Sequence, residues 1–217
     1  MIFPDLQLYQ TRLDISQIDF EHLWQFLAED ERSRANNFKR EHLKQRFVAA
    51  RGNLREILGK HLSCEPSEII FSYGDRGKPY VEGIYFNVAH SQDLAIYVVC
   101  GDRDVGIDLE YIEPKCDVDS ISQHYFLPSE HEIIRSLGDR EKYLAFFRAW
   151  TLKESYAKAT GQGIANTLNL VDISSLLKMP LGETLQIDGW TLTTLETQPS
   201  YAAALCVAIS QAQNLSC

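Results

Sequence analysis

The sequence predicts an α+β fold made of two similar halves, each with a helix followed by strands. In the first half, apolar residues recur at helical spacing within residues 32–60, and the spacing becomes that of strands from Ile69 onward. In the second half, a helical stretch from about 140 to 160 precedes apolar segments near the end of the chain. Weak internal sequence similarity between residues 90–99 and residues 201–207 suggests that the two halves are alike.

The first half begins with a basic amphipathic helix. Between Arg32 and Lys60 there are nine basic residues and two acidic ones, and apolar residues such as Leu54 and Leu58 lie at helical intervals. Strands are expected at 69–73, at two places within 85–100 and at 105–110, with turns at Gly74-Asp-Arg-Gly and Gly101-Asp-Arg-Asp.

The second half begins after a change from sheet to helix around 112–122, where Pro114 breaks regular structure. This places the two halves at 1–112 and 113–217. Ser129 and Glu132 predict a capping box, and Gly138 predicts the end of that helix. The remaining elements are a long helix at 140–160 closed by Gly161 and strands near 168–173, 190–195 and 201–209.

Composition excludes several classes of protein. A chain of 217 residues buries roughly 70% of its unfolded surface, and 45% apolar residues argue against disorder. The 21 basic and 30 acidic residues give a net charge of −9, which would repel nucleic acid, so an anionic ligand needs a local basic patch such as the helix at 32–60. No apolar run approaches the roughly 20 residues that cross a bilayer.

The cysteines and the first residues indicate a cytoplasmic protein. Five cysteines without any C-x-x-C spacing favour neither a disulfide framework nor a zinc site. The start of the chain, Met1-Ile-Phe-Pro-Asp, does not read as a secretory signal.

Three carboxylates are candidates for a metal site. Asp108 and Glu110 lie two apart in an expected strand, so both face the same side, and such a pair suits Mg²⁺. The alternative is an acidic strand edge in solvent. Glu154 continues the helix stripe that carries Phe147, where an unpaired charge would be costly. Its alternative is a surface salt bridge to Lys158.

Two further residues could meet a phosphate. His90 stands at a strand end, where a side chain reaches a ligand more easily than in the strand centre, although a lone histidine is more often structural. Lys78 lies in the turn Gly77-Lys-Pro79, where a lysine is ordinarily solvated.

The joint order of these motifs resembles that of the Sfp-type 4′-phosphopantetheinyl transferases, over about residues 39–163. The motifs are the basic helix, Gly77-Lys-Pro, the strand ending in His90-Ser91, Gly106-Ile-Asp-x-Glu110 and Trp150-x-x-Lys-Glu154-x-x-x-Lys158. The resemblance implies a fold of two α/β halves related by a pseudo-twofold axis. It also implies transfer of the 4′-phosphopantetheine arm of coenzyme A to a serine of an acyl or peptidyl carrier protein, releasing adenosine 3′,5′-bisphosphate.

The resemblance also implies roles for individual residues. Asp108, Glu110 and Glu154 would bind Mg²⁺, and Lys158 would contact the pyrophosphate as a point charge. Glu130 matches a glutamate proposed to deprotonate the serine. The remaining coenzyme A contacts would come from His90 and Arg46 at the 3′-phosphate, with Arg51 and Lys44 as further candidates, and from Lys78 along the nucleotide.

One departure from the family pattern and two rival classes stay open. Many relatives have Ser before the histidine, where this chain has Ala89, so one contact to phosphate is absent or comes from Ser91. The rival classes are a non-catalytic module that binds coenzyme A or a carrier, and a Mg²⁺-dependent pyrophosphohydrolase acting on nucleotides. Chains of this length in the family are usually monomeric, with no nucleic acid or membrane partner.

Overall fold

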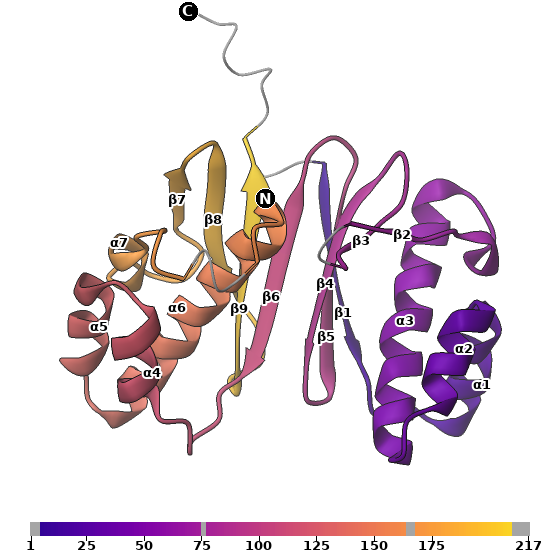
Figure 1. Ribbon diagram of the computed structural model, residues 1–217, viewed down its shortest axis with the longest axis horizontal. Coiled ribbons are helices and arrows are strands. Elements are labelled where there is room, and N and C mark those ends of the chain that lie inside the picture. The colour runs from indigo at the N-terminus through magenta and orange to yellow at the C-terminus, as the bar shows by residue number, and fades with distance from the viewer. Residues whose placement is uncertain (1–4, 75–76, 164–167, 210–217) are drawn as a thin grey trace, which may run out of the picture.

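Two antiparallel sheets lie against each other at the centre of the molecule, and helices cover the outer side of each sheet (Figure 1). This computed structural model describes residues 5–74, 77–163 and 168–209. The apolar core between the sheets includes Ile96 and Val98 from one sheet and Ile107 and Leu205 from the other. The α+β fold predicted from the sequence is confirmed.

The first sheet has three strands in the order β1-β5-β4, and a long helix, α3, packs on it. The core beneath α3 includes the fully buried Val48, Ala49 and Leu58. The elements are β1 (Leu6–Arg12), α1 (Gln17–Phe26), α2 (Glu29–Asn36), α3 (Glu41–Leu62), a 3₁₀ turn (Pro66–Glu68), the short pair β2 (Ser72–Tyr73) and β3 (Pro79–Tyr80), β4 (Tyr85–Ser91) and β5 (Leu94–Cys100).

The second sheet has four strands in the order β6-β9-β8-β7, and the equally long helix α6 packs on it. Gly161 closes α6 in the left-handed conformation, at φ +69°, as the sequence predicted. The elements are β6 (Val105–Tyr111), α4 (Val118–Tyr125), α5 (Pro128–Arg135), α6 (Asp139–Thr160), α7 (Ser174–Leu177), β7 (Thr184–Ile187), β8 (Trp190–Leu195) and β9 (Tyr201–Ala208).

The edges of the two sheets meet at β4 and β6. Side chains of β4, in place of its backbone, form hydrogen bonds with the backbone of β6 here. Asn87 Oδ1 accepts a hydrogen bond from the Ile107 N–H at 3.0 Å, and Ser91 Oγ accepts one from the Tyr111 N–H at 3.0 Å. Both acceptors lie on β4, and both donors lie on β6. These two bonds satisfy backbone groups of β6 that do not pair with β9, so they join the first sheet to the second.

Helix α6 approaches β6 more closely than a side chain allows. A Cβ added to Gly106 would overlap the backbone oxygen of Ser155 and the backbone nitrogen of Ala159. Because glycine has no Cβ, strand and helix touch through their backbones at this point. Asp108 and Glu110 on β6 are thereby held close to Glu154 and Lys158 on α6.

Most of the expected elements are confirmed. The basic stretch at 32–60, expected as one helix, is instead divided between α2 and α3, and the other errors lie in short segments. Strands β4, β5, β6, β8 and β9 and helix α6 are found where the sequence predicted them, while the segment near 168–173 is not a strand and only Ser72–Tyr73 of 69–73 is one. The capping box at Ser129 is also wrong. Helix α5 begins at Pro128, and the side chain of Glu130 accepts from the backbone of Leu127 at 2.9 Å. Gly138 precedes α6 as its N-cap.

The division at residue 112 and the pseudo-twofold axis stay predictions. Strand β6 precedes residue 112 but pairs with β9 in the second sheet. The turn residues 75–76 lie outside the described residues. The four cysteines that the structure describes, Cys64, Cys100, Cys116 and Cys206, form no disulfide. Within the described part of the chain, none of the helices combines the length and apolar character needed to span a bilayer.

Candidate functional site

The three candidate carboxylates gather where β6 faces α6. Asp108 and Glu110 project from β6, and Glu154 and Lys158 lie one turn apart on α6. Asp108 is 4% exposed, and its Oδ1 accepts a hydrogen bond from Lys158 Nζ at 2.7 Å. Glu110 Oε2 accepts a hydrogen bond from Ser91 Oγ at 3.2 Å. The salt bridge from Glu154 to Lys158, weighed from the sequence, is not found among the ion pairs of the described chain, since Lys158 pairs with Asp108 instead.

The pKa values of all three carboxylates are raised, in each case mainly by burial. Burial raises the pKa of Asp108, although the nearby Lys158 lowers it in part. Burial and the charge of Asp108 raise the pKa of Glu110. Burial, followed by the charge of Asp108, raises the pKa of Glu154 to about 7. Three carboxylates thus share one lysine, and each is harder to ionise than in water.

The cluster fits a divalent cation in its chemistry, although its side chains are not arranged as a metal site. Over residues 5–74, 77–163 and 168–209, no three His, Cys, Asp or Glu side chains are placed to hold an ion together. Asp108 Oδ2 is nevertheless buried and has no hydrogen-bond partner. A buried carboxylate oxygen without a partner, next to two more carboxylates, is the kind of donor set that Mg²⁺ accepts.

A cavity of about 310 Å³ opens beside the cluster, between the two halves. Its lining combines Lys78 and Val88 from the first half with Glu154 and Lys158 from the second. Lys78 Nζ donates to the backbone oxygens of Lys158 at 2.8 Å and Val105 at 3.2 Å, and burial lowers its pKa. Lys78 therefore anchors the end of α6 to β6, and it borders the cavity.

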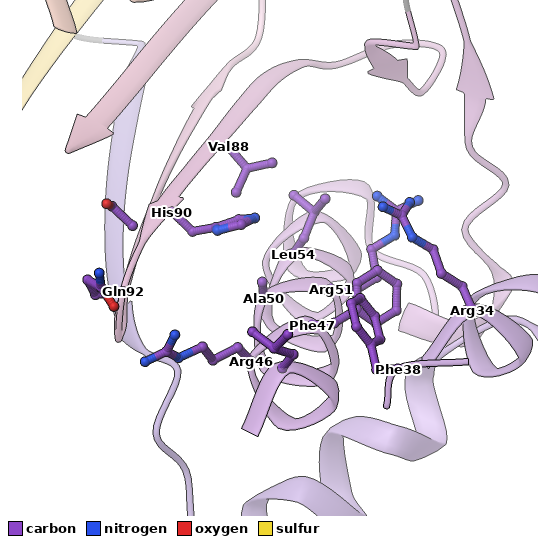
Figure 2. Close-up of a pocket in the computed structure, with 12 residues that line it drawn as sticks. Arg34, Phe38, Arg46, Phe47, Ala50, Arg51, Leu54, Val88, His90 and Gln92 are labelled. Carbon is purple, nitrogen blue, oxygen red and sulfur yellow. The ribbon is translucent and has the colours of Figure 1, made fainter. Parts of the chain in front are cut away.

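A second cavity, of about 540 Å³, adjoins the first at Val88 and lies between α3 and β4 (Figure 2). Arg46 and His90 both line it, so the two residues that the resemblance implies for the 3′-phosphate lie at the same cavity. Arg46 is held by Asp93, with its Nη2 2.6 Å from Asp93 Oδ1. The side chain of His90 is exposed at the strand end, yet partial burial lowers its pKa, as do the charges of Lys158 and Arg46. The imidazole is therefore harder to protonate than in water, mainly because it is partly buried and also because Lys158 and Arg46 are nearby.

Lys44 does not lie with these residues. Its Nζ stands over the rings of Phe20 and Trp24 of α1, at 5.9 and 5.3 Å from their centroids. It is not among the residues that line either cavity. The prediction that Lys44 helps to hold a phosphate is therefore not supported, because its side chain packs on α1.

Arg51 lines the larger cavity but is already engaged. Its guanidinium lies 3.8 Å from the centroid of the Phe71 ring, forms an ion pair with the buried Glu31 and donates to Tyr73 Oη at 2.7 Å. Arg55 also binds Glu31, at 2.6 Å. This arrangement ties α2 to α3 and the following hairpin, so we assign Arg51 a structural role at the wall of the cavity.

Arg34 is a cation at this cavity that sequence reasoning did not single out. It lies on α2, is exposed, and its guanidinium stands 5.1 Å from the centroid of the Phe47 ring (Figure 2). Within the described chain it forms no ion pair, unlike Arg46 and Arg51. The sequence signal was present, because Arg34 belongs to the basic stretch at 32–60, but nothing in that stretch marked which residues face β4.

Glu130 is far more buried than a base acting on a partner protein can be. Its side chain is 0% exposed and forms an ion pair at 2.9 Å with Lys153, which is also 0% exposed. Its oxygens also accept from the backbone N–H groups of Leu127 and Ile173, both at 2.9 Å. With both oxygens engaged and no access to solvent, Glu130 does not reach a docked serine, and the geometry disagrees with its predicted role as the base.

Comparison with known proteins identifies relatives of this chain. The model of the 4′-phosphopantetheinyl transferase superfamily matches residues 104–207, which contain β6, α6 and the acidic cluster. The 4′-phosphopantetheinyl transferase HetI of Nostoc sp. (strain PCC 7120) is 39% identical over 214 residues, covering 96% of this chain and 90% of that protein. The 4′-phosphopantetheinyl transferase Sfp of Bacillus subtilis (strain 168) is 24% identical over 214 residues, covering 94% and 92%.

A further relative matches a shorter stretch. The putative 4′-phosphopantetheinyl transferase slr0495 of Synechocystis sp. (strain PCC 6803) is 34% identical over 150 residues, covering 67% of this chain and 61% of that protein. These relatives are transferases, and in this chain the acidic cluster lies beside a cleft lined by residues of both β4 and α6. This chain belongs to the 4′-phosphopantetheinyl transferase superfamily.

Proposed function

We propose that this protein transfers the 4′-phosphopantetheine group of coenzyme A to a serine of an acyl or peptidyl carrier protein. The observation that carries the proposal is the buried cluster of Asp108, Glu110 and Glu154 with Lys158, which borders a cleft in a chain of this superfamily. In the reaction, the serine oxygen bonds to the β-phosphorus of coenzyme A. The bond from that phosphorus to the bridging oxygen breaks, adenosine 3′,5′-bisphosphate leaves with the electron pair, and the serine loses its proton.

Basic residues on both sides of the cleft are suited to hold the two anionic parts of coenzyme A. Arg46, His90 and Arg34 lie around the larger cavity and would hold the 3′-phosphate, for which the planar guanidinium groups are well shaped. Lys158, which is 32% exposed beside Asp108, would contact the pyrophosphate. Lys78 would border the nucleotide while keeping the end of α6 against β6.

The acidic cluster is the proposed place for Mg²⁺. Asp108, Glu110 and Glu154 would hold the ion, which when bound polarises a phosphoryl oxygen and offsets charge on the leaving group. The protein's own contribution is to keep three carboxylates together with limited access to water. The pKa values of Asp108, Glu110 and Glu154 are raised, so a cation bound among them would favour their ionised forms.

The remaining proposals concern the surroundings of the reaction. The partner is an apo carrier protein, and the protein acts as a monomer in the cytoplasm, where its free cysteines stay reduced. With a net charge of −9, attraction of an acidic carrier over long range is unfavourable, so docking relies on local contacts.

Intact-mass measurement of carrier proteins tests the proposal directly. A panel of apo carriers is incubated with coenzyme A and Mg²⁺. The mass of a carrier is expected to increase by one phosphopantetheine group. One molecule of adenosine 3′,5′-bisphosphate should be released for each carrier modified. Tight binding of coenzyme A without transfer to any carrier would instead indicate a binding module. Release of free phosphopantetheine without a carrier would indicate a pyrophosphohydrolase.

Coenzyme A is expected to bind more tightly as the pH falls from 8.5 to 6.5. The pKa of His90 lies below its ordinary value in the free protein, whereas a bound phosphate stabilises imidazolium and raises it. Binding therefore takes up a proton, and its affinity increases as the pH falls through the raised pKa. Calorimetry in buffers of different ionisation enthalpy measures that proton.

Two controls isolate the contact between His90 and phosphate. The dependence on pH should weaken in His90→Gln, and it should weaken equally for wild-type protein with dephospho-coenzyme A, which lacks the 3′-phosphate. Equal proton uptake with both ligands would show that His90 does not meet the 3′-phosphate.

Replacing Ser91 with alanine is expected to raise the Mg²⁺ concentration needed for half-maximal transfer. The Ser91 hydroxyl holds Glu110 Oε2 and the Tyr111 N–H, so its loss frees the carboxylate and leaves a backbone donor unpaired. The free energy of unfolding should fall by about 1–3 kcal/mol. Ser91→Thr keeps the hydroxyl and should restore the Mg²⁺ requirement. An unchanged requirement in Ser91→Ala would show that Glu110 needs no such support.

A further inference from the structure

The side chain of Lys158 takes the place of a cation within the acidic cluster. Its Nζ donates a hydrogen bond to Asp108 Oδ1 at 2.7 Å. The other oxygen of that carboxylate, Asp108 Oδ2, is buried and has no hydrogen-bond partner among the described residues. As these side chains stand, one oxygen of Asp108 is bound to an ammonium group and the other is out of reach of any ligand in the cavity. A metal ion therefore needs this arrangement to change before Asp108 becomes its ligand.

The ammonium group of Lys158 can move while its backbone stays in place. The side chain is 32% exposed and lines the cavity of about 310 Å³. Its backbone oxygen accepts a hydrogen bond from Lys78 Nζ at 2.8 Å, which holds the end of α6 against β6. A lysine ammonium is carried on a flexible four-carbon stem. Rotation of the stem thus moves the charge from Asp108 into the cavity without a shift of the helix.

The charge of Lys158 acts on the whole cluster. Burial raises the pKa of Asp108, Glu110 and Glu154, and the charge of Lys158 lowers each of these pKa values in part. A divalent cation among the same carboxylates would lie close to the ammonium group, and like charges repel strongly at short range where water is limited. Lys158 and a metal ion therefore compete for the cluster.

We propose that Lys158 keeps the acidic cluster closed to Mg²⁺ in the free protein and that bound coenzyme A opens it. The pyrophosphate would attract the ammonium group from Asp108 into the cavity, so that Asp108 exchanges a lysine for a metal ion. Each anionic group then keeps a cation, and no charge is left buried alone. The exchange agrees with the free side chains, because no three acidic, histidine or cysteine side chains of the described ranges are arranged to hold an ion. The inference rests on the proposed function, since the pyrophosphate of coenzyme A is the group that moves Lys158.

Calorimetric titration of the full chain with Mg²⁺ tests whether Lys158 closes the cluster. Without coenzyme A, Lys158→Met should bind Mg²⁺ at least about tenfold more tightly than the wild type, because no ammonium group competes for Asp108. With saturating coenzyme A, the two proteins should bind Mg²⁺ within about twofold of each other, because the ammonium group of the wild type has already left Asp108. No gain in the free variant, or an equal gain with and without coenzyme A, would overturn the proposal.

Two further variants separate this exchange from a general effect of charge and from misfolding. Lys142→Met removes the same charge from α6, where Lys142 pairs with the exposed Asp119 at 2.9 Å, and it should bind Mg²⁺ as the wild type does. A gain in Lys142→Met equal to that in Lys158→Met would overturn the proposal. Lys158→Gln removes the charge but keeps a hydrogen-bond donor for Asp108, so it should show the gain in affinity even if Lys158→Met does not fold.

The two titrations also separate this inference from the proposed function. If the wild type binds no coenzyme A, the proposed function is wrong and the opening step falls with it. The titration with Mg²⁺ alone still decides whether Lys158 closes the cluster, because it needs neither coenzyme A nor a carrier protein.

Discussion

Replacing Glu154 with glutamine is expected to reduce transfer to carrier proteins by about 10²-fold or more at saturating Mg²⁺. The substitution keeps the size of the side chain and removes one of three charges from the acidic cluster. Intact-mass analysis of the carrier measures the loss. Glu141→Gln, an exposed glutamate on the same helix, should transfer at the wild-type rate. If Glu154→Gln transferred at nearly the wild-type rate, the assignment of Glu154 as a metal ligand would be wrong.

The stability of the same variant provides a second measurement, which does not depend on activity. In the absence of Mg²⁺, the folded-state pKa of Glu154 is raised from 4.5 to about 7, so ionisation of Glu154 opposes folding. This cost is absent below about pH 4.5, grows as the pH rises, and is complete above about pH 7. Glu154→Gln should therefore exceed the wild type in free energy of unfolding by about 1–3 kcal/mol at pH 8, with the difference vanishing near pH 4.5.

Replacing Lys153 with methionine is expected to lower the free energy of unfolding by about 3–5 kcal/mol. Lys153 and Glu130 are both 0% exposed, and the change leaves the charge of Glu130 buried without a cation. Urea denaturation measures the loss. The double variant Lys153→Met/Glu130→Gln should recover part of it, because no uncompensated charge remains. A single variant as stable as the wild type would show that the pair contributes nothing.

The same pair separates a structural role for Glu130 from a catalytic one. If Glu130 acts only by holding α5, α6 and the segment at Ile173 together, the folded double variant should retain measurable transfer at a temperature well below its unfolding. If kcat of a folded double variant fell by about 10³-fold, a purely structural role for Glu130 would be wrong.

The sequence predicted the large elements because their signals are local. Strands β4, β5 and β6 and helix α6 show sustained periodicity, and Gly161 ends α6 as a residue that accepts positive φ. The misplaced cap shows the limit of such signals. Ser129 and Glu132 match the capping-box spacing, but Pro128 is the first residue of α5, so Glu130 performs the capping instead.

The sequence predicted the surroundings of a site residue only where the residues that contact it lie close to it in the chain. Lys44 and Arg46 are both basic, yet two positions on a helix differ by about 200°, so they face different sides. Which side meets β4 depends on the packing of α3 on the first sheet. Of these two residues, Arg46 lines the cavity and Lys44 does not. The partners that engage Arg51 and Glu130 lie 20 and 23 residues away, at Glu31 and Lys153, beyond the reach of any local pattern.

The contact at Gly106 has a consequence for how the acidic cluster keeps its dimensions. Where two elements are separated by side chains, changes in those side chains alter the spacing by small steps. Here main-chain atoms of Ser155 and Ala159 take the place that a Cβ would need, so the strand already stands at the shortest separation from the helix. The spacing between the carboxylates on β6 and the carboxylate on α6 is therefore set by main-chain atoms, which every residue type has. Substitutions in the surrounding core should change this spacing little.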